Sequence, residues 1–174
     1  MPTYDHVTKP VFIRPGLSDF LIGVLSEFTT ISAPVAPFTN PGDSVTIASA
    51  HVPATGKGFY RCYQVKTKHE GKSTSSGTFG AKTMKNEFKV FVPGTDAATL
   101  EFVMNIINEE VMTLHRDADC EDPNWFQLGD GCTNAEIDSE FTTGTTDSGD
   151  KGYVLTVKWN GIPKVYAATV PYAP

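Results

Sequence analysis

EFKVFVPGTDAATLEFVMNIINEEVMTL, residues 87–114, places a strand, a break and a helix in direct succession. Residues 87–92 have the pattern of a strand, and Pro93-Gly94 ends it. Thr95 or Asp96 can then cap a helix, because a short side chain that carries an oxygen accepts a hydrogen bond from a free helical N–H group. The apolar residues after this cap follow a helical period: Leu100, Val103, Met104, Ile107, Val111 and Leu114. We therefore predict one helix over about residues 96–115, whose single apolar stripe covers a sheet face.

The chain on both sides of this stretch alternates apolar and polar residues, which is the period of a half-buried strand. The segments with this period are 45–50, 59–66, 136–141 and 153–159. Asn160-Gly161 supplies a two-residue turn, so residues 164–170 are predicted to return as the second strand of a hairpin. The predicted fold class is mainly β: an antiparallel β-sandwich or barrel with one flanking α-helix and a long projecting loop.

The projecting loop is predicted over residues 68–83, KHEGKSTSSGTFGAKT, which are too rich in Gly, Ser, Thr and Lys to bury apolar area. The first 42 residues hold six prolines and are predicted to form an extended arm with one short helix between Phe20 and Phe28. Such an arm lies either on a neighbouring subunit or across its own domain. The predicted division is a proline-rich arm, residues 1–42, and a β-domain, residues 43–174.

Size and composition are those of an ordinary globular protein. The 174 residues are 40% hydrophobic and 20% charged, which suits one domain with a buried core. The chain has no run of eighteen apolar residues, so no membrane span is predicted. The first residues also lack the pattern of a secretory signal. We expect synthesis in the cytoplasm and no membrane partner.

Charge is sorted along the sequence. Residues 57–89 hold eight basic residues against Glu70 and Glu87, a net charge of +6, whereas residues 94–150 hold fourteen acids against Arg116 alone, a net charge of −13. A protein that needs only solubility intersperses the two signs, because mixed charge avoids large fields of one sign. The sorting indicates surfaces that meet another copy of the chain or a nucleic acid, and the overall net charge of −6 argues against the nucleic acid.

One acidic cluster has part of a calcium-binding pattern. Asp117, Asp119, Glu121 and Asp122 begin like a calcium loop, in which carboxylate oxygens surround one hard cation. The pattern lacks the glycine at its sixth position and the glutamate at its twelfth, where Leu128 stands. A solvated loop is the preferred interpretation.

Cysteines and histidines are scattered along the chain. His115, Cys120 and Cys132 could contribute to a zinc site, but no C-x-x-C or H-x-x-x-H spacing anchors one. A Cys120–Cys132 disulfide is conceivable, although a chain without an export signal usually keeps its thiols reduced. The four histidines lie in unrelated local patterns, so no catalytic triad is predicted. We predict that the chain is not an enzyme and has no catalytic residues, no metal site and no cofactor.

Four segments and the Lys/Gly/Ser-rich loop between them carry a family resemblance. The segments are PGDSVTI (41–47), FVPGTDAATLEFVMNIINEEV (91–111), WFQLGDGC (125–132) and FTTGTTDSGDKGYVLTVKWNGIPKVYAATV (141–170). In this order they resemble the tail tube (major tail) proteins of tailed bacteriophages over roughly residues 43–170. The proline-rich first forty residues match nothing in the resemblance, which leaves a tail ring or connector protein as an alternative.

The resemblance implies a virion structural protein of the phage tail, assembled in the host cytoplasm. Its β-sandwich would join other copies in a hexameric ring with an inner barrel, and DNA would pass through the stacked rings without specific binding. The implied partners are copies of the chain itself and other virion tail proteins. The loop of residues 68–83 would contact the next ring. The residues expected at this contact are Lys68, Lys72, Phe79 and Lys82.

An acidic lumen fits this family, because DNA carries a negative charge about every 1.7 Å of its axis and would adhere to a basic channel. The candidates that face the lumen are Glu136, Asp138 and Glu140, which alternate with Ile137 and Phe141.

Two further classes stay open. A capsid decoration or receptor-binding β-domain would share the β pattern but need no ring, so the size of the assembly separates it from a tube subunit. An enzyme with dispersed catalytic residues would be found only by an activity screen.

Overall fold

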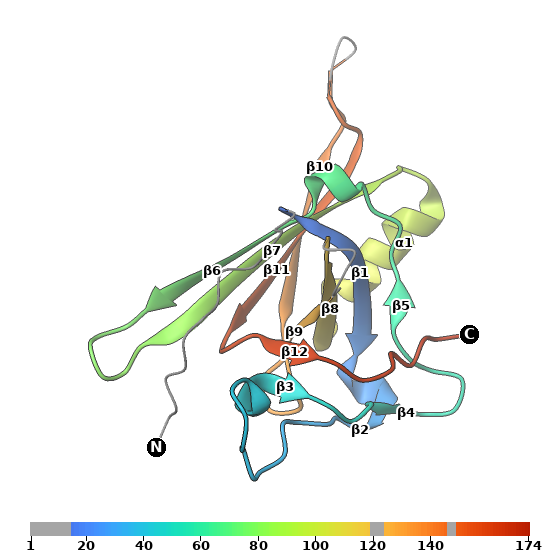
Figure 1. Cartoon of the computed structure of the whole chain (residues 1–174). Helices are drawn as coiled ribbons and strands as arrows, with labels where there is room; N and C mark the ends of the chain where they lie inside the picture. Colours follow the sequence, from blue (N-terminus) through green and yellow to red (C-terminus); the bar gives the residue numbers. More distant parts are fainter. Residues whose placement is uncertain (1–14, 119–123, 146–148) are drawn as a thin grey trace.

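The computed structural model describes residues 15–118, 124–145 and 149–174. In this part of the chain two β-sheets pack face to face, and one α-helix lies beside them (Figure 1). The predicted mainly β fold class, a sandwich with one helix, is confirmed. Residues 1–14 of the predicted arm lie outside the described residues.

The first sheet has four strands, is antiparallel throughout and has the spatial order β10-β11-β7-β6. Its strands are β6 (Glu70–Ser76), β7 (Thr83–Pro93), β10 (Glu136–Thr142) and β11 (Gly152–Asn160). The strands predicted at 87–92, 136–141 and 153–159 are confirmed within β7, β10 and β11. Their alternation identified them because every second side chain, such as Val90 and Leu155, is buried between the sheets.

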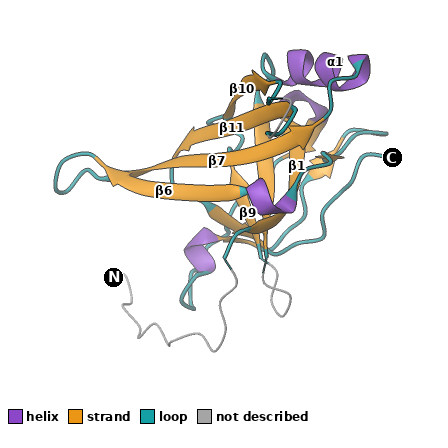
Figure 2. Cartoon of the chain, turned by 90° about the horizontal axis from the view of Figure 1, so that it is seen from above, coloured by secondary structure: helices purple, strands orange, loops and turns teal. Residues whose placement is uncertain are grey.

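The segment predicted as a projecting loop is instead a projecting hairpin. Residues 70–76 form β6, which pairs with β7 from Glu70 opposite Lys89 to Ser76 opposite Thr83. Residues 77–82 make the turn, where Gly77 has a φ of 109° and an added Cβ would lie 2.7 Å from the Ala81 carbonyl oxygen. The loop prediction was wrong because a strand exposed on both faces needs no apolar residues. Figures 1 and 2 show the hairpin extending beyond the sandwich.

The second sheet has six strands in the order β3-β12-β9-β8-β1-β5. Its strands are β1 (Leu17–Val24), β3 (Thr46–Ile47), β5 (Tyr60–Arg61), β8 (Val111–Asp117), β9 (Trp125–Leu128) and β12 (Lys164–Tyr166). Neighbours are antiparallel except β12 and β3, which run parallel. The strands predicted at 45–50 and 59–66 are therefore much shorter than expected, with two residues each.

The prediction of a helix between Phe20 and Phe28 is wrong, because these residues include most of β1. This strand lies between β8 and β5. Phe20, Leu21 and Ile22 are all fully buried, with Phe20 and Ile22 in the core between the sheets and Leu21 on the opposite side. A short apolar run that is buried on both faces has no strand period, so periodicity alone could not identify it. The predicted boundary at residue 42 does not separate this strand from the sheet.

The α-helix, α1 (Ala97–Ile106), is shorter than the predicted 96–115. Asp96 caps it as expected, with the Thr99 backbone N–H donating to Asp96 Oδ2 at 3.2 Å. The second half of the prediction was wrong, since Val111 and Leu114 belong to β8. Their spacing fits a helical stripe by coincidence. A helix would not explain why Met112, Thr113 and His115 between and beside them are also fully buried.

The predicted hairpin at Asn160-Gly161 is also wrong. The chain leaves β11 at Asn160 and crosses to the six-stranded sheet, where β12 pairs with β9 and β3. The described chain also has five short elements. They are η1 (Leu25–Glu27), β2 (Phe28–Thr30), η2 (Asp43–Val45), β4 (Val52–Pro53) and η3 (Lys66–Lys68), of which β2 and β4 pair with each other.

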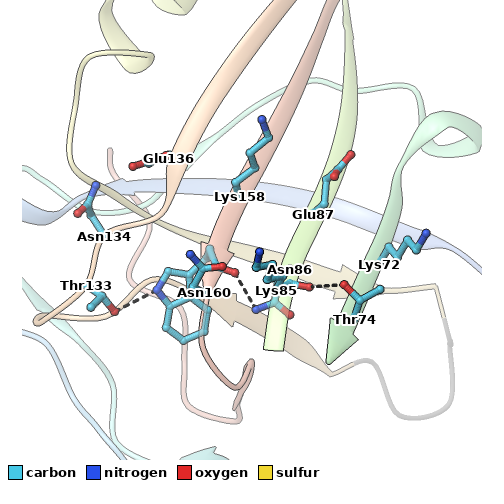
Figure 3. Close-up of a pocket in the computed structure, with 11 residues that line it drawn as sticks. Lys72, Thr74, Lys85, Asn86, Glu87, Thr133, Asn134, Glu136, Lys158 and Asn160 are labelled. Carbon is cyan, nitrogen blue, oxygen red and sulfur yellow. Dashed lines mark hydrogen bonds between the residues drawn. The ribbon is translucent and has the colours of Figure 1, made fainter. Parts of the chain in front are cut away.

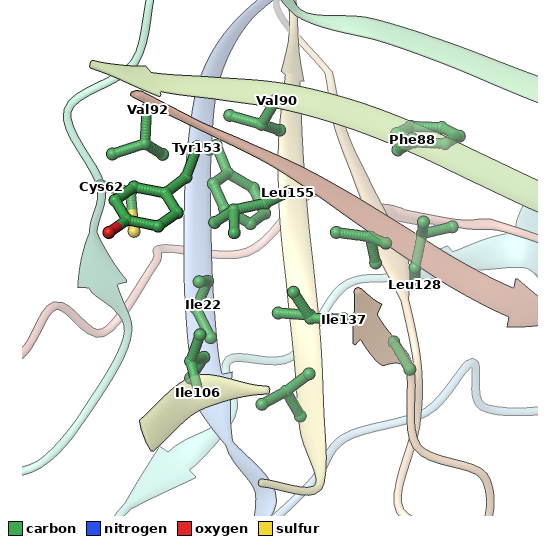
Figure 4. Packing of buried hydrophobic residues seen from close by; sticks show 14 of the residues in the cluster. Ile22, Cys62, Phe88, Val90, Val92, Ile106, Leu128, Ile137, Tyr153 and Leu155 are labelled. Atoms are coloured by element: carbon green, nitrogen blue, oxygen red, sulfur yellow. The ribbon is translucent and has the colours of Figure 1, made fainter. Parts of the chain in front are cut away.

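Two apolar clusters hold these layers together. The larger lies between the two sheets and includes Ile22, Val90, Leu155 and, from α1, Ile106 (Figure 4). The second lies on the other face of the six-stranded sheet and contains Leu21, Ile47, Phe59, Met112, Leu114 and Tyr166. The four-stranded sheet therefore has one face in the core, and its other face is free to carry polar groups.

Candidate functional site

The face of the four-stranded sheet that points away from the core carries charged side chains on all four strands. Side chains alternate along a strand and residues paired across strands share a face, so the register determines which residues these are. They are Glu70 and Lys72 on β6, Lys85, Glu87 and Lys89 on β7, Glu136, Asp138 and Glu140 on β10, and Lys158 on β11. We call this surface the charged face. Its five acids and four lysines give a net charge of −1.

Four of these residues form one row with alternating sign. Glu136 is opposite Lys158, Lys158 is opposite Glu87, and Glu87 is opposite Lys72. Figure 3 shows the four side chains on neighbouring strands. Each opposite-charge pair across strands contributes roughly 0.2–1 kcal/mol. The row therefore favours this register but adds little to the total stability.

Ion pairs also connect this row to the next one. Lys158 Nζ lies 2.5 Å from Asp138 Oδ2, and this hydrogen bond raises the pKa of Lys158. Lys89 Nζ lies 3.2 Å from Glu87 Oε1. All four side chains are about half exposed, so water and salt screen these pairs strongly. The charges on this face thus stay available to a partner.

All four residues of the row line a shallow hollow of about 510 Å³. Its floor is fixed by Asn86, whose amide nitrogen donates to the Trp159 and Gly161 carbonyl oxygens at 3.1 and 2.7 Å. Ser73 Oγ donates to the amide oxygen of Asn86 at 2.6 Å, so one side chain joins β6, β7 and the end of β11. Of the residues described, no cysteine or histidine lines the hollow. Its lysines, acids and amides can form ion pairs and hydrogen bonds with a polar partner.

The acidic candidates Glu136, Asp138 and Glu140 are brought together by the structure. All three are exposed and project from β10 on the charged face. Ile137 lies between them on the core side and is buried, whereas Phe141 on the same side is 49% exposed. The surface around them is mixed in sign, because β7 and β11 add lysines that the sequence could not place there.

The four residues predicted at an inter-ring contact are spread over the hairpin and do not form one surface. Lys68 lies in η3 at its base, where it pairs with Asp150 of the same chain and lies 5.1 Å from the centre of the Phe91 ring. Lys72 belongs to the charged face. Phe79 and Lys82 lie at the tip, and Phe79 is 99% exposed. Only these last two residues extend beyond the sandwich.

The structure also places buried histidines that the sequence did not indicate. His69 Nε2 lies 2.9 Å from His115 Nδ1, and His115 Nε2 lies 3.0 Å from Thr113 Oγ1. Burial lowers the pKa of His69 to about 4, and burial also lowers the pKa of His115 well below its usual value. His51 Nε2 lies 2.8 Å from Gln127 Oε1, and burial lowers its pKa as well. These rings are neutral core groups, and their sequence separation of 46 or 76 residues left no local signal.

No group of three or more His, Cys, Asp or Glu residues is arranged to hold a metal ion within residues 15–118, 124–145 and 149–174. Asp119, Cys120, Glu121 and Asp122, which belong to the calcium, zinc and disulfide interpretations, lie outside these ranges. Cys132 is exposed with a free thiol. Cys62 is buried, which raises the pKa of its thiol to about 12 and suits a core residue.

Comparisons with known proteins identify no relative: no family model, no curated protein and no solved structure matches the chain. Among the described residues, no helix is long and apolar enough to cross a bilayer. The functional conclusion therefore depends on the geometry of this chain.

Proposed function

We propose that this chain is a tail tube subunit of a tailed bacteriophage, which assembles into rings that surround a channel for DNA. The observation that carries the proposal is the four-stranded sheet, with two open edges and a charged, solvated face. Within the described residues, β6 and β10 each pair with a neighbour on one side only. Open edges favour association with another strand, and closing a sheet into a barrel removes them.

The geometry of these edges suits a ring of copies that all point the same way. Because the sheet has four antiparallel strands, β6 and β10 run in opposite directions. If β6 of one copy lies beside β10 of the next, the new pair is antiparallel as well. Six copies, the number implied by the family resemblance, would join roughly 24 strands. Barrels of about 16–18 strands already enclose a water-filled channel.

Charge on the two edges supports the same pairing. The outer face of β10 offers three acids in succession, Glu136, Asp138 and Glu140, whereas β6 offers one lysine, Lys72, next to one acid, Glu70. Lys72 would therefore meet an acid even if the strands shift by two residues. In this ring the charged face lines the channel, and its net charge of −1 presents no basic strip that would hold DNA phosphates.

Negative-stain electron microscopy of the purified chain tests this function. We expect rings or short tubes with a central channel, and a Lys72→Glu variant should form far fewer of them. Lys164→Glu, on β12 in the other sheet, makes the same change of charge away from both edges and should assemble normally. A chain that stays monomeric at high concentration contradicts the proposal and favours a decoration or receptor-binding domain.

A further inference from the structure

We infer that the His69–His115 pair is a proton-sensitive latch, which keeps the base of the β6–β7 hairpin closed at neutral pH and lets it open in mild acid. His69 lies between η3 and β6, and His115 lies in β8. We call residues 66–71 the latch segment, because opening would move these residues away from β1 and β8. The inference concerns a single chain and goes beyond the proposed function.

His69 is the only buried side chain in a long exposed stretch. All of residues 66–85 are described, and every one except His69, which is 3% exposed, is partly or fully exposed. The His69 ring meets the Phe20 ring edge-on, with 6.2 Å between their centres, and its Nε2 lies 2.9 Å from His115 Nδ1. Phe20 and His115 belong to β1 and β8, which pair with a strand on each side. His69 is therefore the member of the pair that can leave.

The other contacts of the latch segment are weak. Lys68 pairs with Asp150, but both side chains are about half exposed, so solvent screens this ion pair. Residues 70 and 71 are the first two of β6 and form one end of its ladder with β7. They can separate from β7 while residues 72–76 stay paired. Burial of His69 is therefore the main contact that keeps the segment closed.

The surroundings of the pair disfavour a proton while the segment is closed. Burial lowers the pKa of both rings, and among the described residues the only carboxylate that acts on His69 is Asp19 of β1. Arg61 and Arg116 already bind this carboxylate, so it compensates a charge on His69 only in part. β7 presents the uncharged Phe88 ring to His115. A proton on His69 is therefore favourable only when the ring reaches water.

Opening would uncover apolar rings at one end of the core. Phe20 is fully buried beneath His69, and Phe88 is 6% exposed beneath Gly71. Gly71 lies so close to the Phe88 ring that an added Cβ would be 2.8 Å from it. A hollow of about 430 Å³ is already lined by Leu17, Gly71 and Phe88. Movement of residues 69–71 would widen this hollow onto both rings, so the latch would present an apolar surface in mild acid.

Native-state hydrogen exchange in low urea tests the latch. Because the pKa of His69 is about 4 when closed and near 6.5 when open, the opening equilibrium of residues 66–71 should rise roughly twentyfold between pH 7 and pH 5. At pH 5 these amides should exchange through an opening that hardly depends on urea, since little surface is exposed. Amides of β8 should exchange more slowly and with the full urea dependence of global unfolding.

Two substitutions of His69 and one control make the test specific. His69→Gln and His69→Leu cannot titrate, so opening of residues 66–71 should lose its pH dependence in both. His51→Gln changes another buried histidine, which contacts Gln127, and should leave that pH dependence intact. The dye 8-anilinonaphthalene-1-sulfonate should bind the wild-type chain at pH 5 but not at pH 7, and His69→Leu should bind it at neither pH.

Two results would overturn the latch. One is a wild-type pH dependence of residues 66–71 in the His69 variants. The other is exchange of these residues at pH 5 with the same urea dependence as β8, which would mean that acid only promotes global unfolding.

Discussion

His69 and His115 lie within hydrogen-bonding distance in the core, with 2.9 Å between ring nitrogens, and Phe20 and Phe88 pack around His115. His69 Nδ1 is buried and has no hydrogen-bond partner among the residues that the structure describes. A proton on either ring would place a charge in an apolar setting, and burial therefore lowers both pKa values. Both rings stay neutral in the folded protein at neutral pH.

These pKa values predict a loss of stability in mild acid. Because the pKa of His69 is lowered from 6.5 to about 4, the unfolded chain binds the proton first, so stability is complete above pH 6.5 and falls as the pH drops toward 4. The loss from this group should be about 3 kcal/mol at most. Urea unfolding at several pH values measures it.

His69→Gln should flatten this dependence, since the glutamine does not titrate. The lowered pKa values of His51 and His115 leave part of the slope in the variant. Asp43 and Asp96 have pKa values lowered from 3.8, so their contributions to stability are lost only at lower pH. They therefore do not affect the change in stability that His69 causes between pH 6.5 and about 4. An unchanged slope would mean that His69 is not buried as a neutral group.

At the scale of single residues, the sequence predicted which face of a strand a side chain occupies. It did not predict which residues of other strands lie next to that side chain. The alternation around Ile137 predicted correctly that Glu136, Asp138 and Glu140 share a face. It could not show that Lys158, Glu87 and Lys72 continue the row, because the register between β10, β11, β7 and β6 joins residues far apart in the chain. The buried pairs His69–His115 and His51–Gln127 were missed for the same reason.

At the scale of elements, two neighbouring residues of α1, one buried and one exposed, allow the same substitution to be compared in the two environments. Val103 is 1% exposed and packs in the core between the sheets, whereas Met104 is 55% exposed. Val103→Asp would bury an unpaired charge and should cost several kcal/mol of the roughly 5–15 kcal/mol that stabilise a domain. Met104→Asp places the same charge in water and should change stability by less than about 1 kcal/mol. Equal thermal melting of the two variants would contradict the position of α1.

Elements with one buried face were predicted, and elements buried or exposed on both faces were not. β7, β10 and β11 alternate, and the sequence identified them. β1 and β8 lie inside the six-stranded sheet with apolar residues on both sides, so their patterns fitted helices as well. β6 is exposed on nearly every residue, and its composition resembled that of a loop. In each case pairing with distant strands decided the structure, which local pattern does not encode.

At the scale of the whole molecule, the charge that is sorted along the sequence gives two ends of opposite charge and one face of nearly balanced charge. The basic hairpin and acidic α1 lie at opposite ends of β7, whereas the charged face mixes both signs to a net charge of −1. Longitudinal contact and passage of DNA need different charge patterns. In the four-stranded sheet, β6 and β7 extend past the sandwich on one side and alternating charge lies along the middle, which is consistent with both parts of the proposed function.

The charge of that face predicts how the assembled protein treats DNA. Changing Glu136, Asp138 and Glu140 to lysine, together with Lys72→Glu so that opposite charges still meet at the proposed ring contact, would raise the net charge of the face from −1 to +3. If the face lines a channel, assembled rings of this variant should retain duplex DNA, and affinity should fall steeply with salt as about 0.9 counterions are released per phosphate contacted. Wild-type rings should not retain it, and gel-shift measurements at several salt concentrations compare the two.

A control of equal charge places the same change elsewhere. Glu109 and Glu110, after α1, can be changed to lysine together, which gives the chain the same total charge on another surface. Retention of DNA by the β10 variant alone would place the charged face where DNA passes. Equal retention and equal salt dependence in both variants would mean that net charge alone governs binding, and the charged face would then have no special access to DNA.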